Sequence, residues 1–237
     1  MRTVLITGAG RGLGFALAEE HLRLGDRVIA WDYQVTDAMQ ELAKTKNLLI
    51  DSADISSTES VNQAADRAAE ECDRIEILYN NAGVYYKGFY DEGRREILDY
   101  DFDTALSMYS INAAGAFRVT KALLQRNLLR AGSTVCMTSS EAGSLQYSKN
   151  FRTYEYTYCM SKAALNKGAT LLYNDIGRKG MRVICFHPGW MKTQMGGEGA
   201  MVSPNDTAKG FMKFTLDFNS SSRENMFFKF DGAPLPW

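Results

Sequence analysis

The chain has 237 residues, of which 45% are hydrophobic, and this is enough to bury one sizeable core. Its 27 Lys and Arg residues nearly balance its 28 Asp and Glu residues, which argues against a nucleic-acid-binding surface. The apolar runs are too short for a secretory signal or a membrane span, so we expect a cytoplasmic protein. We therefore expect a single domain over residues 1–237 that binds a small molecule.

Short runs rich in β-branched and aromatic residues alternate along the chain with longer stretches of helical periodicity. This alternation is typical of parallel strands joined by crossover helices. The sequence therefore predicts an α/β, three-layer Rossmann fold with a seven-stranded parallel sheet and helices on both faces. The seven expected strands are Thr3 to Thr7, Arg27 to Trp31, Asn47 to Ile50, Ile75 to Tyr79, Ser133 to Met137, Arg182 to Phe186 and Met226 to Phe230.

A glycine-rich turn follows the first expected strand. Residues without a Cβ let the backbone approach a pyrophosphate, and the helix that follows offers unpaired N–H groups. The pattern is T-G-x-x-x-G-x-G rather than G-x-G-x-x-G, and Phe15 stands where a P-loop needs its lysine. The sequence predicts a dinucleotide site formed here by Gly8, Gly10, Arg11, Gly12, Leu13 and Gly14.

A carboxylate, Asp32, stands at the expected end of the second strand. In this position it would accept hydrogen bonds from the adenosine ribose hydroxyls and repel a 2′-phosphate. Arg11 in the glycine-rich turn would instead attract that phosphate. We favour NAD(H) as the cofactor and keep NADP(H) as the alternative.

Tyr158 and Lys162 are four residues apart on an expected helix and share one face of it. A neighbouring ammonium favours a phenolate, so Tyr158 is a candidate for exchanging a proton with a carbonyl or hydroxyl group. Ser140 follows the fifth strand, where its hydroxyl would hold a substrate oxygen. Asn112 is a poor helix former in a helical stretch, and either holds a water or bends the helix. These four residues are the candidate catalytic set.

Other chemistries have little support in this sequence. The four cysteines lack metal-ligand spacing and are expected to be reduced thiols, so we predict no metal site. A hydrolase is disfavoured because there is no G-x-S-x-G motif, and because His21 and His187, the only histidines, show no obvious partner.

Together these motifs resemble the short-chain dehydrogenase/reductase family. The resemblance lies in T-G-A-G-R-G-L-G, N-N-A-G, Asn112, Ser140, Y-C-M-S-K and H-P-G-W-M-K-T, and it covers nearly the whole chain. Within the family, the chain is most similar to the carbonyl-reductase-like subgroup related to bacterial C-factor. The resemblance implies a hydride transfer between a nicotinamide cofactor and a carbonyl or secondary alcohol.

The resemblance also implies roles for individual residues. Tyr158 would be the general acid/base, Lys162 would favour its ionised form and contact the nicotinamide ribose, Ser140 would orient the substrate oxygen, and Asn112 would anchor a proton-relay water. Further cofactor contacts would be Asp54 and Ile55 at the adenine, Asn81, Ala82 and Gly83 on the adenosine side, and Met191 and Thr193 at the carboxamide, with Pro188 and Gly189 in the same set.

The resemblance further implies a homodimer or homotetramer packed through the helices that carry Asn112 and Tyr158. The segment between Ser140 and Tyr158 is longer than in the simplest family members, so Gln146 to Glu155 would border the substrate pocket. Its surroundings are rich in aromatic residues, which favours an aromatic or apolar substrate. Those aromatic residues are Tyr147, Phe151, Tyr154 and Tyr156.

A lid is expected from Trp190 to about Asp206, with Gly196, Gly197 and Gly199 as hinges. Two alternative functions stay open. A nucleotide-sugar epimerase shares the glycine-rich turn and the Tyr-x-x-x-Lys helix, but usually has a longer C-terminal portion. A catalytically silent NAD(P)-binding regulator would share the fold, although such proteins typically lack part of the catalytic set.

Overall fold

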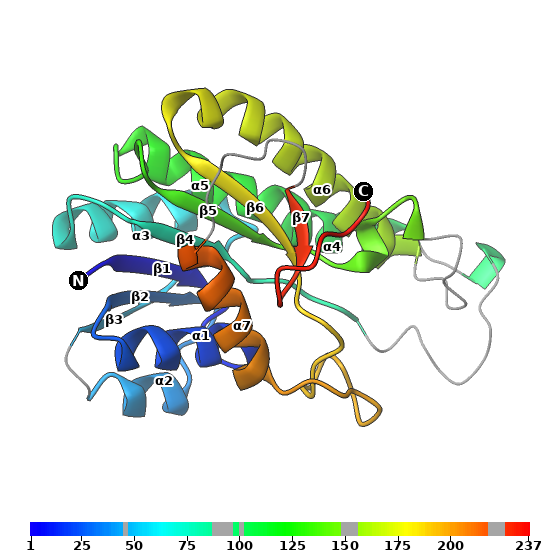
Figure 1. Cartoon of the computed structure of the whole chain (residues 1–237), viewed down its shortest axis with the longest axis horizontal. Coiled ribbons are helices and arrows are strands. Elements are labelled where there is room, and N and C mark those ends of the chain that lie inside the picture. Colours follow the sequence, from blue (N-terminus) through cyan, green and yellow to red (C-terminus); the bar gives the residue numbers. More distant parts are fainter. Residues whose placement is uncertain (45–46, 87–96, 100–101, 148–155, 218–225) are drawn as a thin grey trace.

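A seven-stranded parallel sheet forms the centre of the molecule (Figure 1). The computed structural model describes residues 1–44, 47–86, 97–99, 102–147, 156–217 and 226–237. The strand order is β3-β2-β1-β4-β5-β6-β7, and every neighbouring pair is parallel, which confirms the predicted sheet. The strands are β1 (Thr3–Thr7), β2 (Arg27–Asp32), β3 (Leu48–Ser52), β4 (Ile77–Asn80), β5 (Thr134–Thr138), β6 (Arg182–His187) and β7 (Phe227–Lys229).

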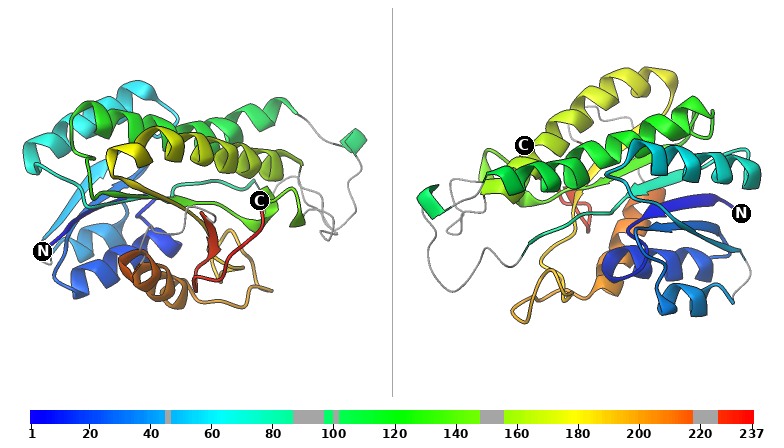
Figure 2. Two further views of the ribbon diagram at one scale, coloured as in Figure 1. Left: turned by 45° about the horizontal axis from the view of Figure 1, so that its top comes forward. Right: turned by 180° about the vertical axis from the view of Figure 1, so that it is seen from behind.

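Helices cover both faces of this sheet (Figures 1 and 2), as the sequence predicts. One face carries α1 (Gly12–Arg23), α2 (Asp37–Leu42) and α7 (Pro204–Asp217). The other carries α3 (Thr58–Glu71), α5 (Ala116–Gln125) and the long α6 (Tyr156–Ile176), with α4 (Asp103–Tyr109) leading into α5 and packed against α6.

The two faces have separate apolar cores because side chains alternate along each strand. In β1, Val4 and Ile6 join the core beneath α1 and α7, whereas Leu5 joins the core beneath α3 and α5. All three are fully buried. A parallel sheet covered on both faces therefore produces the continuous apolar runs seen in the sequence.

The observed strand ends match the predicted ones or differ from them by one or two residues. One of the two-residue differences is at β4, where the sequence predicts a start at Ile75 and the strand begins at Ile77. Ile75 instead donates its N–H to the Leu128 carbonyl, 2.8 Å away, in the connection before β5. This contact comes from a residue far along the chain, and no local pattern signals it.

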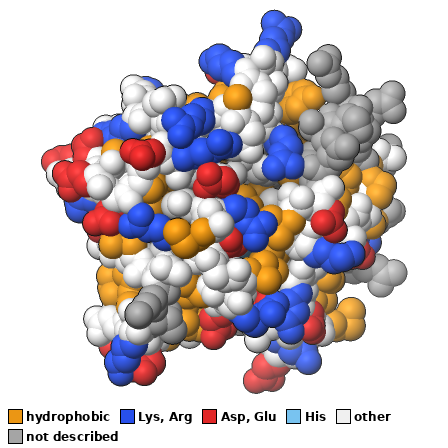
Figure 3. Space-filling model, turned by 60° about the vertical axis from the view of Figure 1, so that its left-hand side comes forward, with side chains coloured by type: hydrophobic (Ala, Val, Ile, Leu, Met, Phe, Trp, Pro, Cys, Tyr) orange, Lys and Arg blue, Asp and Glu red, His pale blue; other side chains and the backbone are white. Residues whose placement is uncertain are grey.

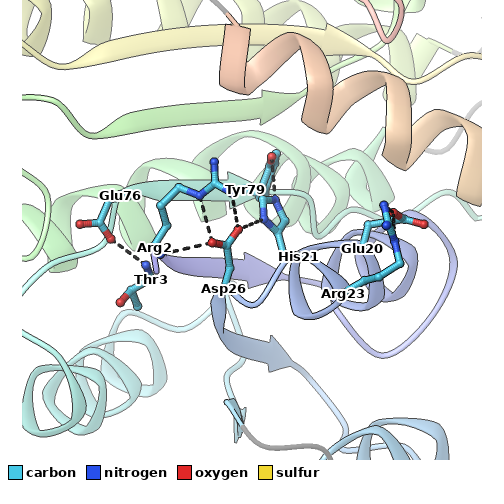
Figure 4. A network of polar contacts seen from close by, with 8 residues as sticks. All are labelled: Arg2, Thr3, Glu20, His21, Arg23, Asp26, Glu76 and Tyr79. Carbon is cyan, nitrogen blue, oxygen red and sulfur yellow. Dashed lines mark hydrogen bonds and ion pairs between the residues drawn. The ribbon is translucent and has the colours of Figure 1, made fainter.

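His21 lies in a buried polar network at the amino end of the sheet (Figure 4). Its Nδ1 is 2.9 Å from Asp26 Oδ2 and its Nε2 is 3.1 Å from the Tyr79 hydroxyl. Asp26 is 2% exposed and also accepts hydrogen bonds from the backbone N–H and Nε of Arg2. Burial alone would raise the pKa of Asp26, but these hydrogen bonds outweigh it and lower the pKa to about 2. The expectation that this histidine has no partner is therefore wrong.

The face shown in Figure 3 carries Lys and Arg side chains interspersed with Asp and Glu side chains, as the near-neutral composition suggests. Among the described residues, no helix combines the length and apolar character that a membrane crossing requires.

Candidate active site

The glycine-rich turn is locked to the segment that follows β4. Thr7 Oγ1 accepts hydrogen bonds from the backbone N–H groups of Asn81 and Ala82, each at 3.1 Å. The Asn81 side chain donates to the carbonyls of Thr7 and Gly8. A Cβ on Gly14 would lie 2.1 Å from the Gly8 oxygen, so only glycine permits this packing. The structure thus brings together the predicted residues of the turn and the Asn81–Ala82 pair.

The N-terminus of α1 opens from this turn. Arg11 is its N-cap residue and makes no side-chain capping hydrogen bond, so the first backbone N–H groups of the helix are available to an anion. A Cβ on Gly12 would meet only Thr193 Cγ2, at 3.4 Å. The unpaired N–H groups at the start of α1, beside the open backbone of Gly12, fit the pyrophosphate of a dinucleotide.

Asp32 ends β2 next to the same turn and is half-buried. Its Oδ2 accepts a hydrogen bond from the Gly10 N–H at 2.7 Å, and its Oδ1 accepts one from the Gln34 N–H at 3.3 Å. Arg11 does not pair with Asp32; its Nη1 donates instead to Gln194 Oε1 at 3.2 Å. The negative charge at the end of β2 is therefore not neutralised by the nearby guanidinium.

Asp54 and Ile55 follow β3, at the same edge of the sheet as Asp32. Asp54 Oδ1 accepts hydrogen bonds from the backbone N–H and the hydroxyl of Ser56. Ile55 is 7% exposed, and its side chain packs against Gly115. Asp54 is the more accessible of the two for an adenine ring.

Asn112 sits in a π-helical turn, Ser110–Gly115, that joins α4 to α5. Its Oδ1 accepts a hydrogen bond from the Val84 N–H at 2.7 Å, and its Nδ2 donates to the Val84 carbonyl at 2.9 Å and to Ser161 Oγ at 3.1 Å. The side-chain amide of Asn112 therefore holds the segment around Val84, which follows β4, against Ser161 of α6. The helix is irregular at Asn112, and π-turns of this kind often mark functional sites. The water that Asn112 is expected to hold stays a prediction.

Lys162 lies beneath this amide and beside Tyr158. Its Nζ is 5.8 Å from the centroid of the Tyr158 ring and donates to the Thr138 carbonyl at 2.8 Å. A Cβ on Gly83 would lie 3.6 Å from Nζ and 3.2 Å from Asn112 Oδ1. Gly83, Asn112 and the Tyr158–Lys162 pair, which come from three separate sequence motifs, therefore lie close together.

Tyr158 is half-buried, and its ring meets that of Tyr85 edge to face, with 5.3 Å between the centroids. Nothing in the sequence pattern marks Tyr85, which is placed here because Asn112 holds its neighbour Val84. Of the aromatic residues expected to border the pocket, Tyr147 packs against the core and Tyr156 lies edge-on to Phe102. The other two, Phe151 and Tyr154, lie outside the described residues.

Ser140 follows β5 and is 9% exposed. Its Oγ accepts a hydrogen bond from the Ala142 N–H at 3.1 Å, which caps the short 3₁₀ helix Glu141–Gly143. Because this oxygen accepts from the backbone, its O–H proton is left to donate toward a substrate oxygen.

Asn166 is a supporting residue that the motifs do not reveal. It accepts a 2.5 Å hydrogen bond from Ser139 Oγ and donates to the Gly143 carbonyl at 3.1 Å. It lies four residues after Lys162 and so on the same face of α6. One helix therefore carries Tyr158 and Lys162 and also holds both sides of the Ser140 turn.

His187 ends β6 beside Ser140. Burial, together with the charge of Lys229, lowers the pKa of His187 to about 4, so the imidazole is neutral at physiological pH. Its Nδ1 accepts a hydrogen bond from the Glu141 N–H at 3.3 Å. Like His21, this histidine has a partner that the sequence does not show. Within the described ranges, no group of three or more His, Cys, Asp or Glu residues is arranged to hold a metal ion.

The expected lid segment after Gly189 forms a closed turn beside the glycine-rich turn. Met191 forms a β-bridge with Val202, and Thr193 Oγ1 accepts a hydrogen bond from the Gly196 N–H at 3.1 Å. A Cβ on Gly196 would lie 1.9 Å from the Met191 oxygen. Close packing against Met191 thus explains why residue 196 is a glycine. The hinge role expected for Gly196, Gly197 and Gly199 stays a prediction. The expected boundary near Asp206 falls inside α7, which begins at Pro204.

Burial of the Lys162 ammonium carries a stability cost that a substitution can reveal. Lys162 is 4% exposed, and burial lowers its pKa from 10.5 to about 8. Because this pKa is lower in the folded chain, stability should rise as pH increases from about 8 to 10.5. Lys162→Met should raise the free energy of unfolding at pH 7 by about 1–3 kcal/mol and remove that rise, as measured by urea unfolding.

Lys167→Met serves as the matched control for this measurement, because Lys167 is an exposed lysine on the same helix. Its substitution should leave both the stability and its pH dependence nearly unchanged. If Lys162→Met unfolded more easily than the wild type at pH 7, burial of its charge would not be the dominant effect.

Comparison with known proteins places this geometry among oxidoreductases. Residues 2–200 match the short chain dehydrogenase family. The C-signal protein of Myxococcus xanthus is 32% identical over 163 residues, which cover 69% of this chain and 93% of that protein. The carbonyl reductase Sniffer of D. melanogaster superposes with a TM-score of 0.89 at 25% identity, over 100% of both chains. The NADPH-bound carbonyl reductase from chicken fatty liver superposes with a TM-score of 0.86 at 25% identity, over 100% of this chain and 99% of that one.

Proposed function

The chain belongs to the short-chain dehydrogenase/reductase family, and from this premise we propose roles for its individual residues. It is an NAD(P)-dependent oxidoreductase that acts on carbonyl or alcohol groups and resembles carbonyl reductases. We propose that Tyr158 is its general acid/base. The observation that carries this proposal is the convergence of Tyr158, Lys162 and Asn112 near Gly83, with Lys162 bonded to the end of β5, two residues before Ser140.

The glycine-rich turn and the uncapped start of α1 would hold the pyrophosphate of the cofactor, and Asp32 the adenosine ribose. When bound, the nicotinamide supplies or accepts the hydride. The remaining proposed cofactor contacts are Asp54, Ile55, Asn81, Ala82, Gly83, Pro188, Gly189, Met191 and Thr193, together with Tyr158 and Lys162. Of these, the segments around Asn81 and Thr193 lie against the turn in the structure.

The chain's own residues would control the proton that accompanies the hydride. The Tyr158 Oη would donate this proton to a carbonyl oxygen during reduction and take it back during oxidation. Ser140 would donate a hydrogen bond to the same oxygen and fix its orientation. The Lys162 ammonium, protonated below its pKa of about 8, would stabilise the phenolate that remains. Asn112, whose amide is already bonded to Val84, would keep this wall of the site in place.

An apolar carbonyl compound is the substrate class that we propose. Tyr85 supports this because its half-buried ring adjoins Tyr158 and would offer an aromatic surface to a substrate bound at Tyr158. We also propose a homodimer or homotetramer formed through α4 and α6. Exposed apolar side chains on these helices support it: Leu106 and Tyr109 on α4, and Met160 and Leu171 on α6.

We propose NAD(H) as the preferred cofactor because the Asp32 side chain ends β2 beside the glycine-rich turn, while Arg11 bonds to Gln194 instead. The alternative, NADP(H), is supported by Arg11 and by the NADPH bound to the chicken liver enzyme. The test is the oxidation of NADH and of NADPH by a panel of ketones, aldehydes and quinones. With Asp32→Ala, NADH should bind about tenfold more weakly and the discrimination against NADPH should shrink, because a hydrogen bond to a charged group contributes about 1.5–3 kcal/mol.

Asp51→Ala is the matched control for this comparison. Asp51 lies on β3 and pairs with Arg67, so its loss should change neither cofactor affinity. Turnover with NADPH alone would overturn the NAD(H) preference. Tight cofactor binding without turnover across the whole panel would instead favour a catalytically silent regulator.

A further inference from the structure

The segment Asp231–Trp237, here called the tail, folds back along the outer strand of the sheet (Figure 1, red). Gly232, with φ +88°, makes the reversal. The Lys229 N–H donates to the Ala233 carbonyl at 2.7 Å, and the Leu235 N–H donates to the Phe227 carbonyl at 2.8 Å. Leu235 is 3% exposed. The tail therefore pairs antiparallel with β7 and covers an edge that would otherwise be open.

Trp237 joins the tail to the segment that follows Ser140. Its indole stacks on Phe227 with 5.3 Å between centroids and 23° between planes. Its backbone oxygen accepts a hydrogen bond from the Gln146 N–H at 3.1 Å. Trp237 and Tyr147 also pack against the same apolar core. The tail thus holds Gln146 and Tyr147, at the end of residues 141–147 that is farther from Ser140.

Hydrogen bonds continue from this anchor back to Ser140. The Tyr147 N–H donates to Ser144 Oγ at 3.1 Å, and the Ser144 N–H donates to the Glu141 carbonyl at 2.9 Å. The Gly143 N–H donates to the Ser140 carbonyl at 2.9 Å. Ser144 is only 1% exposed. A displacement of Gln146 would therefore be transmitted to Ser140 through a short hydrogen-bonded segment, in which Gly143 and Ser144 are buried.

We propose that Trp237 is a positioning residue for the carbonyl substrate. By stacking on Phe227, its indole holds the Trp237 backbone oxygen against the Gln146 N–H, and so fixes residues 141–147 and through them the direction of the Ser140 hydroxyl. The inference rests on the proposed function, because it takes Ser140 as the group that orients the substrate oxygen. The tail lies at the β7 edge of the sheet, whereas the glycine-rich turn and Asp32 lie at β1 and β2. The effect should therefore fall on the substrate and not on cofactor affinity.

The test compares Trp237→Ala with Trp237→Phe in the full chain. Trp237→Ala should lower kcat/KM for carbonyl substrates by about 10- to 100-fold, because small misplacements of catalytic groups have effects of this size. The dissociation constant for NAD(P)H should stay the same. Trp237→Phe keeps a ring on Phe227 and should restore most of the activity. Tyr173→Ala, which removes a half-buried aromatic ring near the far end of α6, is the control and should leave kcat/KM nearly unchanged.

Amide hydrogen exchange provides a second readout that needs no turnover. In Trp237→Ala, the Gln146 amide should exchange at least about tenfold faster, while amides of β1 stay protected. Faster exchange at Gln146 with unchanged kcat/KM would overturn the positioning role, as would a parallel loss of cofactor affinity. Unchanged exchange would show that the indole is not needed to hold the Trp237 backbone oxygen against Gln146, and would overturn the role of this side chain as an anchor. A wild-type chain that reduces no carbonyl would count against the proposed function, and the exchange at Gln146 would still decide whether Trp237 anchors this segment.

Discussion

Tyr158→Phe should lower kcat/KM for carbonyl reduction by about 10²- to 10⁴-fold, the range typical of a lost general acid. The substitution removes only the hydroxyl and keeps the ring that meets Tyr85 and Lys162. The affinity for NAD(P)H should therefore change little. Steady-state kinetics and the quenching of protein fluorescence by NAD(P)H would measure the two quantities on the same preparation.

Tyr109→Phe is a suitable control, because Tyr109 is an exposed tyrosine at the end of α4. It should retain the activity of the wild type. If Tyr158→Phe kept more than about a tenth of the wild-type kcat/KM, another group would have to deliver the proton. A loss of NAD(P)H binding in the same variant would instead indicate a disturbed site.

Asp26→Ala should destabilise the chain by about 3–5 kcal/mol, as expected when one partner of a buried charged pair is removed. The substitution would leave the fully buried His21 Nδ1 and the side chain of Arg2 without their carboxylate. Urea unfolding would give the change in free energy. Asp66→Ala, which removes an exposed partner of Arg126, should change stability far less.

The acid dependence of stability gives a second measure of Asp26. Its pKa falls from 3.8 to about 2 because the hydrogen bonds from His21 and Arg2 outweigh burial. Because the pKa is lower in the folded chain, the ionised Asp26 stabilises the fold above about pH 3.8. This stabilisation is lost as the pH falls toward 2. The contribution is about 2 kcal/mol at neutral pH. Asp26→Ala should lose this part of the acid dependence, and an acid transition identical to that of the wild type would contradict the assignment.

Parallel topology explains why so much of this fold could be predicted from the sequence. Strands covered on both faces read as continuous apolar runs, and the candidate site residues follow the strand ends because those ends meet at one edge. Helical spacing predicts that Tyr158 and Lys162 share one face of a helix, and the motifs that accompany them mark this pair among the many of its kind.

Features that depend on contacts between distant parts of the chain could not be predicted in this way. One of the two partners of His21 is Tyr79, 58 residues along the chain and brought close by the pairing of β1 with β4. Asn112 also bonds to Val84 and Ser161, which lie 28 and 49 residues away along the chain. The anchor between Trp237 and Gln146 likewise joins segments that share no motif.

The Asp26 network and the catalytic residues lie at opposite ends of the same strands, and this arrangement bears on how the protein can evolve. Substitutions that alter substrate choice should fall on loops beyond the carboxyl ends, whereas the buried network near the amino ends would keep its partners. Asp26 and Ser140 share no hydrogen-bond partner among the described residues, so the effects of their substitutions on stability should add. New specificities can therefore accumulate at one end while the other preserves the fold.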